Sequence, residues 1–200
     1  MVRAKFWLAA LLVAGLGAGM ATAANAQADS SVPTAKPEKP WRVKLGAFFP
    51  GDGDVKDEIG STLFSYGVSY DFLKTNLANP IIVGAYLDGA TGSKKRDGVT
   101  LRLSYVGLGP TARYYFTPVT SATRVYGGVG LGVYFVNSKA STRVGGATLS
   151  LSDDETKFGG KLLAGVESGQ GLFGELDYTF ISEINERNPG GFNVAVGYRF

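Results

Sequence analysis

The final stretch of the chain, Phe192–Phe200, alternates between large apolar side chains at one parity and small or polar side chains at the other. A period of two is that of a β-strand, because successive side chains leave opposite faces. About nine residues is also the length that a tilted strand needs to cross a bilayer. The apolar parity ends in Tyr198 and Phe200, while Arg199 lies on the opposite face. We therefore interpret this stretch as the closing strand of a barrel with lipid outside and a polar interior.

Other parts of the chain repeat this pattern. Stretches with the same two-residue period, each predicted to be a strand, are 41–49, 64–72, 81–88, 99–116, 125–135, 157–167 and 172–180. A closed sheet is the form in which strands can cross lipid, because an open edge would leave backbone polar groups without partners. The 29 Gly, 12 Phe and 10 Tyr are typical of tight turns and aromatic girdles. We predict an all-β fold, an eight-stranded antiparallel up-and-down transmembrane β-barrel preceded by a cleavable signal peptide.

The fourth predicted strand changes parity partway along its length. Leu103 and Tyr105 are expected to face outward and Arg102 inward, whereas from Val106 onward the apolar parity is the opposite one. One extra residue in a strand produces such a reversal. We therefore predict a β-bulge within residues 105–110, a segment that contains two glycines and a proline.

The connections between the predicted strands alternate in length. Those after even-numbered strands are short, roughly four to eight residues, and those after odd-numbered strands run from roughly nine to twenty. This alternation is typical of short periplasmic turns and long external loops, so both termini are expected in the periplasm. The external loops are predicted to include a charged tip, 93–98, and the long segment 137–155.

The N-terminus has the pattern of an export signal. Two basic residues precede the apolar run 6–20, and the small residues Ala24-Asn25-Ala26 follow it. A membrane anchor is the alternative, but the run is shorter than the roughly 20 residues of a spanning helix. We expect cleavage after Ala26, with Ala28 as the alternative site.

These features divide the chain into a signal peptide (1–26), a flexible periplasmic leader (27–40) and an outer-membrane β-barrel domain (41–200). Without residues 1–26 the chain has 18 basic and 17 acidic residues, a net charge of +1, so its basic pI does not indicate nucleic-acid binding. The absence of cysteine excludes a disulfide framework. The expected location is the cell outer membrane, reached through the periplasm.

Several segments of the predicted barrel resemble a known family. They are Val106–Phe116, Phe158–Lys161, Glu175–Tyr178 and Gly197–Phe200. Over about residues 41–200 the chain resembles the small eight-stranded outer-membrane barrels of the OmpA, OmpX, OmpW and opacity-protein group. The resemblance implies a barrel surrounded by outer-membrane lipid and lipopolysaccharide. The tail is also similar to the signal read by the barrel-assembly machinery, with Tyr198 and Phe200 as its aromatic residues.

No catalytic site is expected. Barrel hydrolases of this kind rely on a histidine, and the chain contains none, so a serine lacks its usual base and a zinc ion its commonest nitrogen ligand. The acidic cluster Asp52, Asp54, Asp57 and Glu58 is interpreted as a solvated loop. Calcium binding is the alternative, but Lys56 stands where a ligand is needed. We predict a protein that is not an enzyme and has no cofactor or metal.

The inward-facing charges form the candidate site. Mixed charges in a narrow interior should pair, because an unpaired buried charge costs several kcal/mol. Projecting the strands from their periplasmic ends places Lys44, Arg113 and Glu175 at similar depth. The predicted lumen ionic network consists of Lys44, Arg113, Lys161, Glu167, Glu175, Asp177 and Arg199. Eight strands leave room for side chains or one small ligand. Two interpretations of the lumen therefore remain, a closed ionic plug and a narrow charge-gated path, and the plug is favoured.

Two functions follow from this reading. The first is a non-enzymatic outer-membrane protein with a structural or surface-interaction role through its external loops. The alternative is a passive channel or transporter for small or hydrophobic solutes, similar to OmpW. The external basic cluster Lys94, Lys95 and Arg96 is interpreted as a solvated tip, and pairing with lipopolysaccharide phosphates is the alternative. No nucleic-acid partner is expected, and the sequence leaves the oligomeric state open, with a monomer expected.

Overall fold

A computed structural model describes residues 34–96, 98–144, 147–182 and 189–200. The elements are β1 (Thr34–Ala35), β2 (Trp41–Pro50), α2 (Gly53–Ile59), β3 (Leu63–Thr75), β4 (Ile81–Arg96), β5 (Val99–Tyr115), β6 (Thr123–Val144), β7 (Ala147–Ser168), β8 (Leu172–Ile181) and β9 (Gly191–Arg199). The expected signal peptide, 1–26, and the leader up to residue 33 lie outside the described residues. Within those residues, no helix has the length and apolar character needed to span a membrane.

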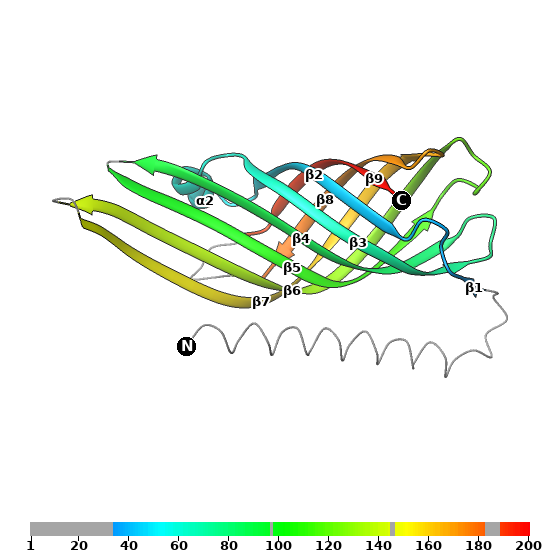
Figure 1. Ribbon diagram of the computed structural model, residues 1–200, viewed down its shortest axis with the longest axis horizontal. Helices are drawn as coiled ribbons and strands as arrows, with labels where there is room; N and C mark the ends of the chain where they lie inside the picture. The colour runs from blue at the N-terminus through cyan, green and yellow to red at the C-terminus, as the bar shows by residue number, and fades with distance from the viewer. Residues whose placement is uncertain (1–33, 97, 145–146, 183–188) are drawn as a thin grey trace. The chain divides into compact units, whose positions relative to one another are not determined.

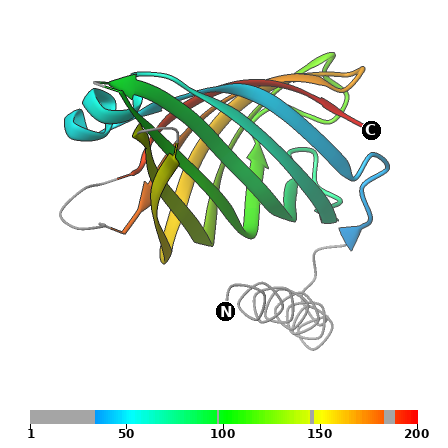
Figure 2. The same ribbon diagram turned by 60° about the vertical axis from the view of Figure 1, so that its left-hand side comes forward.

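The eight long strands form one closed antiparallel ring (Figures 1 and 2). Each strand from β2 to β9 pairs with its neighbour in the chain. Pairing of β2 with β9, from Arg42 opposite Arg199 to Pro50 opposite Gly191, closes the ring. The predicted fold, an eight-stranded antiparallel up-and-down barrel, is therefore confirmed. The two-residue strand β1 adds to the edge of β3, with Thr34 opposite Thr75.

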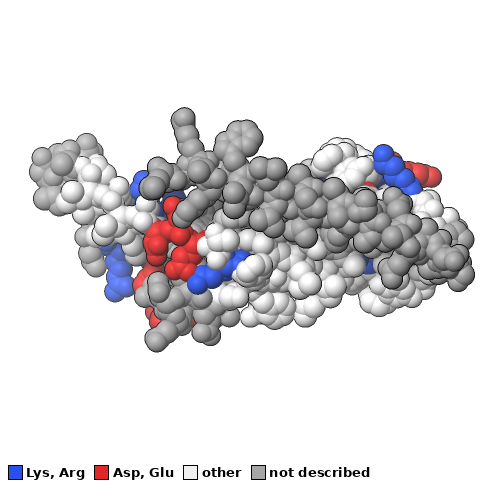
Figure 3. All heavy atoms as spheres, turned by 90° about the horizontal axis from the view of Figure 1, so that it is seen from below, with Lys and Arg blue, Asp and Glu red and all other residues white. Residues whose placement is uncertain are grey.

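Apolar side chains face away from the barrel axis and charged ones face towards it. Leu131 and Val196 are 69% and 67% exposed, whereas Arg113 and Glu175 are 2% and 5% exposed. In the part of the surface visible in Figure 3, charged side chains gather towards the two ends and the band between them is mostly uncharged. This is the inverse of a soluble barrel, and it matches a surface that is solvated by lipid.

The two ends of the barrel differ. At one, which we call the hairpin end, lie α2 and the tips of the β4–β5 and β6–β7 hairpins (Figure 1). At the other, the turn end, lie the short connections 76–80, 116–122 and 169–171. Long loops were predicted at 93–98 and 137–155, and this prediction was wrong because the structure extends the strands through these segments. Most of 93–98 and 137–155 is strand, because β4 has 16 residues and β6 and β7 have 22 each.

The predicted β-bulge within residues 105–110 is absent. The pairing of β4 with β5 runs from Arg96 opposite Val99 to Ile81 opposite Tyr114 without a register shift. Leu103 and Tyr105 face the interior and are buried, so the outward orientation predicted for them was wrong, as was the inward one of Arg102. The ring does have a register shift between Asp71 and Leu73, in the pairing of β3 with β4.

The interior of the hairpin end contains a small apolar core. Its buried members are Phe48, Val55, Ile59, Leu63, Ala90, Leu103, Tyr105, Tyr134, Val136 and Ile181. Two of them, Val55 and Ile59, come from α2, so the helix packs over the mouth of the barrel. Beyond the lipid band the strands thus meet water on the outside and bury apolar residues inside, as a soluble sheet does.

The segment that carries the acidic cluster is a helix at its centre. The predicted solvated loop was therefore wrong in form. Asp52 is the N-cap, and its side chain accepts hydrogen bonds from the backbone N–H groups of Asp54 and Val55. An N-cap carboxylate satisfies donors that would otherwise lack partners in the first turn. Asp52 thus helps to hold the helix that places Val55 and Ile59 over the mouth of the barrel.

Candidate functional site in the barrel lumen

Glu167 is the centre of an ionic layer at the turn end. Its Oε2 accepts from Arg42 Nη1 at 2.6 Å and from the Tyr115 hydroxyl at 2.9 Å. Its Oε1 accepts from Arg199 Nη1 at 3.0 Å and also from Arg124. The glutamate is 1% exposed. Three guanidinium groups therefore share one buried carboxylate, and hydrogen bonds satisfy both of its oxygens.

Arg42 connects this layer to the middle of the lumen. Its Nη2 donates to the Tyr126 hydroxyl at 2.8 Å, and that hydroxyl donates to Glu175 Oε2 at 3.0 Å. The guanidinium also lies 4.0 Å from the centre of the Phe173 ring, in cation–π contact. A chain of hydrogen bonds thus runs from Glu167 through Arg42 and Tyr126 to Glu175.

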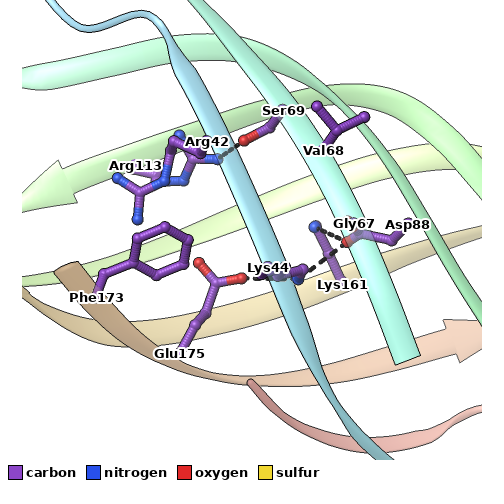
Figure 4. Close-up of a pocket in the computed structure, with 10 residues that line it drawn as sticks. All are labelled: Arg42, Lys44, Gly67, Val68, Ser69, Asp88, Arg113, Lys161, Phe173 and Glu175. Carbon is purple, nitrogen blue, oxygen red and sulfur yellow. Dashed lines mark hydrogen bonds and ion pairs between the residues drawn. The ribbon is translucent and has the colours of Figure 1, made fainter. Parts of the chain in front are cut away.

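Lys44 is the centre of the middle layer (Figure 4). Its ammonium group lies 2.8 Å from Glu175 Oε1, 3.0 Å from Asp177 Oδ2 and 3.1 Å from Asp88 Oδ2. Lys161 Nζ lies 2.5 Å from the same Asp88 oxygen. Two cations therefore alternate with three carboxylates across the width of the barrel, and this arrangement lowers the electrostatic cost of burying each of them.

Arg113 forms an ion pair outside the group that contains Lys44 and Glu175. Its Nη1 donates to Asp71 Oδ1 at 2.6 Å and its Nη2 donates to Ser69 Oγ at 3.0 Å. Two buried atoms of this pair, Arg113 Nε and Asp71 Oδ2, have no hydrogen-bond partner in the described structure. Arg113 thus forms its own pair on the β3–β5 side of the lumen, apart from the Lys44 group with which the sequence placed it.

Polar contacts continue towards the hairpin end. Asn193 Nδ2 donates to Asp177 Oδ2 at 2.9 Å, and the Ser65 hydroxyl donates to Asn193 Oδ1 at 2.6 Å. The hydroxyls of Tyr86 and Tyr134 lie 3.1 Å apart. Above them lies the apolar core that includes α2. From turn end to hairpin end the lumen thus contains an ionic layer, a second ionic layer and an apolar layer.

A small cavity lies among these side chains. It lies between Lys44, Asp88, Arg113 and Phe173, and its empty volume of about 220 Å³ includes space open to solvent (Figure 4). Inward glycines do not widen it, because side chains or backbone of neighbouring strands cover them. A Cβ added at Gly107 would overlap the Tyr134 ring, and one at Gly165 the Tyr126 ring.

The structure places all seven predicted network residues in the interior, each buried. It also adds residues that the predicted network left out: Arg42, Asp71, Asp88, Arg124, Tyr115 and Tyr126. Asp71 and Asp88 have the inward parity of their strands, so parity could have found them. Arg124 lies one residue before the predicted start of its strand.

The other predicted site residues lie on the surface. Tyr198 and Phe200 are 45% and 53% exposed on the outer face of the last strand. Lys94, Lys95 and Arg96 end β4, and Lys94 Nζ donates to the backbone oxygen of Asp57 in α2 at 3.0 Å. The structure therefore separates this basic cluster, because neighbouring residues in a strand face opposite sides.

A closed β-ring with an apolar outside, a charged inside and elongated hairpins at one end defines a small β-barrel of the outer-membrane type. The profile of one family, the outer membrane protein beta-barrel domain, matches residues 9–200. The chain belongs to this family, which places it in the outer membrane.

Solved structures with a similar fold include three outer-membrane proteins. Neisserial surface protein A is 18% identical with a TM-score of 0.53, and the match covers 84% of this chain and 97% of that one. Ail, the attachment invasion locus protein of Yersinia pestis, is 16% identical with a TM-score of 0.46, covering 82% and 100%. The outer membrane enzyme PagL is 12% identical with a TM-score of 0.49, covering 80% and 98%. At these identities the likeness concerns the fold alone, and no curated protein matches the chain.

Proposed function

We propose that this protein is a non-enzymatic outer-membrane barrel that presents its long hairpins at the cell surface. The observation that carries the proposal is the filling of the lumen. Glu167 and Lys44 centre two ionic layers, and the apolar core with α2 closes the hairpin end. A protein whose interior is packed in this way offers its surface, rather than its bore, to other molecules.

The energetics favour a lumen that stays closed. Opening a path would separate several buried ion pairs at once, and leaving one such charge without its partner costs about 3–5 kcal/mol. Spontaneous opening is therefore rare even if only one layer has to yield, since every 1.4 kcal/mol reduces the open population tenfold.

The hairpins are the feature most suited to an interaction role. They extend the β4–β5 and β6–β7 pairs beyond the apolar band, so they project from the membrane as rigid sheet rather than as loose loops. We infer that the hairpin end faces the exterior and the turn end the periplasm, as short turns in this class of barrel do. The similar Neisserial protein is a surface protein by name.

A non-enzymatic role is supported by the composition of the chain. Because PagL shares the fold, the fold by itself leaves catalysis open. The chain has no histidine, and the described residues contain no group of three metal-binding side chains placed to hold an ion. The buried carboxylates of the lumen are engaged by arginine and lysine, which leaves them poor general bases.

Planar-bilayer recording tests the closed lumen. Purified wild-type protein should show no steady single-channel openings. The variant Lys44→Gly/Glu175→Gly removes one charge of each sign from the middle layer, leaves Asp88 with Lys161, and should raise the frequency of openings. Regular openings of the wild-type protein would contradict the proposal.

Passive transport of a small or hydrophobic solute is the second candidate. The observation in its favour is the lumen cavity between Lys44, Asp88 and Arg113. In this case wild-type protein would conduct, and Arg113→Gln would change the ion selectivity of the openings. The same recording therefore separates the two candidates.

Trimming the hairpins tests the surface role. Replacing residues 93–98 by a two-residue turn, or shortening the hairpin within 137–155, should abolish binding of the protein to cells or surface ligands. The lipid-crossing strands are unchanged by these edits, so the barrel should still migrate as a folded species on unheated gels. Unaltered binding in both variants would contradict a role for the hairpins.

We also infer the route by which the barrel reaches the membrane. Residues 1–26 would be removed on export, and 27–40 would remain as a periplasmic leader before the barrel domain at 41–200. The barrel-assembly machinery would recognise the aromatic tail that ends in Tyr198 and Phe200. N-terminal sequencing of the protein from outer-membrane fractions tests the cleavage, and Gln27 is the expected first residue.

A further inference from the structure

A set of cations lies on the outer face of the barrel near the hairpin end, where the orientation of β5 is opposite to the predicted one. Arg102 points outward and lies directly opposite Lys139 of β6. Lys95 of β4 shares this face, because it is two residues along the strand from Ser93, the partner of Arg102. All three residues are exposed. We call Lys95, Arg102 and Lys139 the outer basic patch.

The outer basic patch lacks counter-charges within the described structure. Its direct neighbours on the same face are neutral: Ser93, Thr100, Ser141 and Ser152. The nearest acidic residue there, Asp154, is diagonal to Lys139 and accepts a hydrogen bond from Asn137 at 2.5 Å. Like charges directly opposite one another destabilise an antiparallel pair, so the Arg102–Lys139 pair is a place where a bound anion would stabilise the protein.

The patch lies just beyond the lipid-facing band. Phe135 and Val106 are the last large apolar residues on that face of β6 and β5, and Lys139 and Arg102 are each four residues further along. Four residues span about 13 Å along a strand, or about 10 Å along the membrane normal at a tilt of about 40°. The polar layer of each leaflet is about 5–8 Å thick. Long basic side chains at this height can bend back to the headgroup layer.

We propose that the outer basic patch binds phosphate groups of lipopolysaccharide in the leaflet that surrounds the barrel. Three cations on adjacent strands attract the negative charge of a lipid phosphate, and charge-assisted hydrogen bonds from arginine to phosphate are among the strongest in proteins. Because the patch adjoins the lipid-facing surface, the occupant that we propose is a lipid. The inference rests on the proposed orientation, with the hairpin end outside.

The same inference changes the role of the predicted cluster at residues 94–96. Lys94 turns inward and donates to α2, whereas Lys95 turns outward. The proposed site for lipid phosphates is therefore built across three adjacent strands rather than from one basic run.

Lipid binding by native mass spectrometry tests the proposal. The refolded protein in a neutral detergent is titrated with diphosphorylated lipid A and, separately, with enzymatically dephosphorylated lipid A. The variant Arg102→Gln/Lys139→Gln should bind diphosphorylated lipid A about tenfold more weakly than wild type, since two charge-assisted contacts are lost. The control Lys36→Gln/Lys39→Gln lowers the net charge equally at exposed sites near the turn end and should bind as wild type does.

The outcomes separate the possible occupants. A wild-type preference for the phosphorylated lipid that the patch variant loses supports the proposal. Equal affinity of wild type for both lipids overturns it, and this comparison holds even if the variant does not fold. Full competition by millimolar inorganic phosphate would show that the patch binds the free ion, and this result also overturns the proposal. The proposal is equally overturned if the patch variant loses binding to an acidic protein while its binding to lipid is unchanged. Single-channel conductance depends on the lumen and not on the outer basic patch. A negative result in the lipid-binding experiment is therefore distinct from a failure of the proposed function.

Discussion

Replacement of Glu167 by glutamine should be among the most destabilising single changes in the barrel. The substitution keeps the size of the side chain, removes its charge and replaces one of its two acceptor oxygens with an NH2 group. Arg42, Arg124 and Arg199 would then lie in the interior without the carboxylate that they share. An amide can still accept hydrogen bonds at one oxygen, so the main loss is electrostatic.

The magnitude follows from the burial of the site. Glu167 and Arg42 are 1% and 2% exposed, so water screens their interaction very little. Breaking a buried ion pair by removing one partner costs about 3–5 kcal/mol, because an uncompensated charge remains. Arg124 and Arg199 are slightly more exposed and can relax towards the turn end, so we expect a value within this range and not a multiple of it.

The same substitution on the same strand provides the control. Glu155 of β7 forms an ion pair with Lys157 at 2.6 Å, but both side chains are 25% exposed. A pair that water reaches contributes about 0–1 kcal/mol, so Glu155→Gln should change the free energy of unfolding by no more than that. The two variants thus differ in burial and not in chemistry.

Urea unfolding of the barrel in lipid vesicles measures both variants. Trp41, at the start of β2, provides the fluorescence signal, because the other tryptophan, Trp7, lies in the expected signal peptide. The double variant Glu167→Gln/Arg199→Gln should recover part of the loss. If Glu167→Gln costs no more than Glu155→Gln, then the lumen is hydrated well enough to solvate three guanidinium groups, and the closed-plug argument fails.

Three further predictions concern α2, the packing of the lumen and the tail. Val55→Asp should release α2 from the apolar core, so limited proteolysis near the helix should become faster while the barrel stays folded; unchanged cleavage would show that the helix is not held by this core. Gly165→Val should destabilise the barrel by about 1–3 kcal/mol because its side chain overlaps the Tyr126 ring, and a neutral result in urea unfolding would mean that the ring is free to move. Phe200→Ala should reduce the folded barrel in outer-membrane fractions several-fold but leave spontaneous refolding into vesicles nearly unchanged. Equal loss in both assays would assign Phe200 to membrane anchoring alone.

Alternation along the strands was enough to predict the architecture. The outward faces of β2, β6 and β9 were predicted correctly, because each crosses the bilayer with lipid on one side and a packed polar interior on the other. The same parity placed the charges that meet in the lumen on inward faces. Which charges meet was less predictable, since it depends on the stagger between neighbouring strands. Arg113, for example, pairs with Asp71 instead of joining Lys44 and Glu175.

The wrong prediction for β5 shows where the alternation of apolar side chains no longer tells which face of a strand points outward. Between Tyr105 and Val106 the apolar residues change from the inner to the outer face, although the backbone continues without a bulge. What changes there is the solvent. From that point towards the turn end, lipid surrounds the barrel, so apolar residues face outward. From that point towards the hairpin end, water surrounds it, so Leu103 and Tyr105 face inward under α2. A reversal of apolar parity inside a continuous strand is therefore the pattern expected at the membrane boundary, and it also explains why Arg102 faces outward.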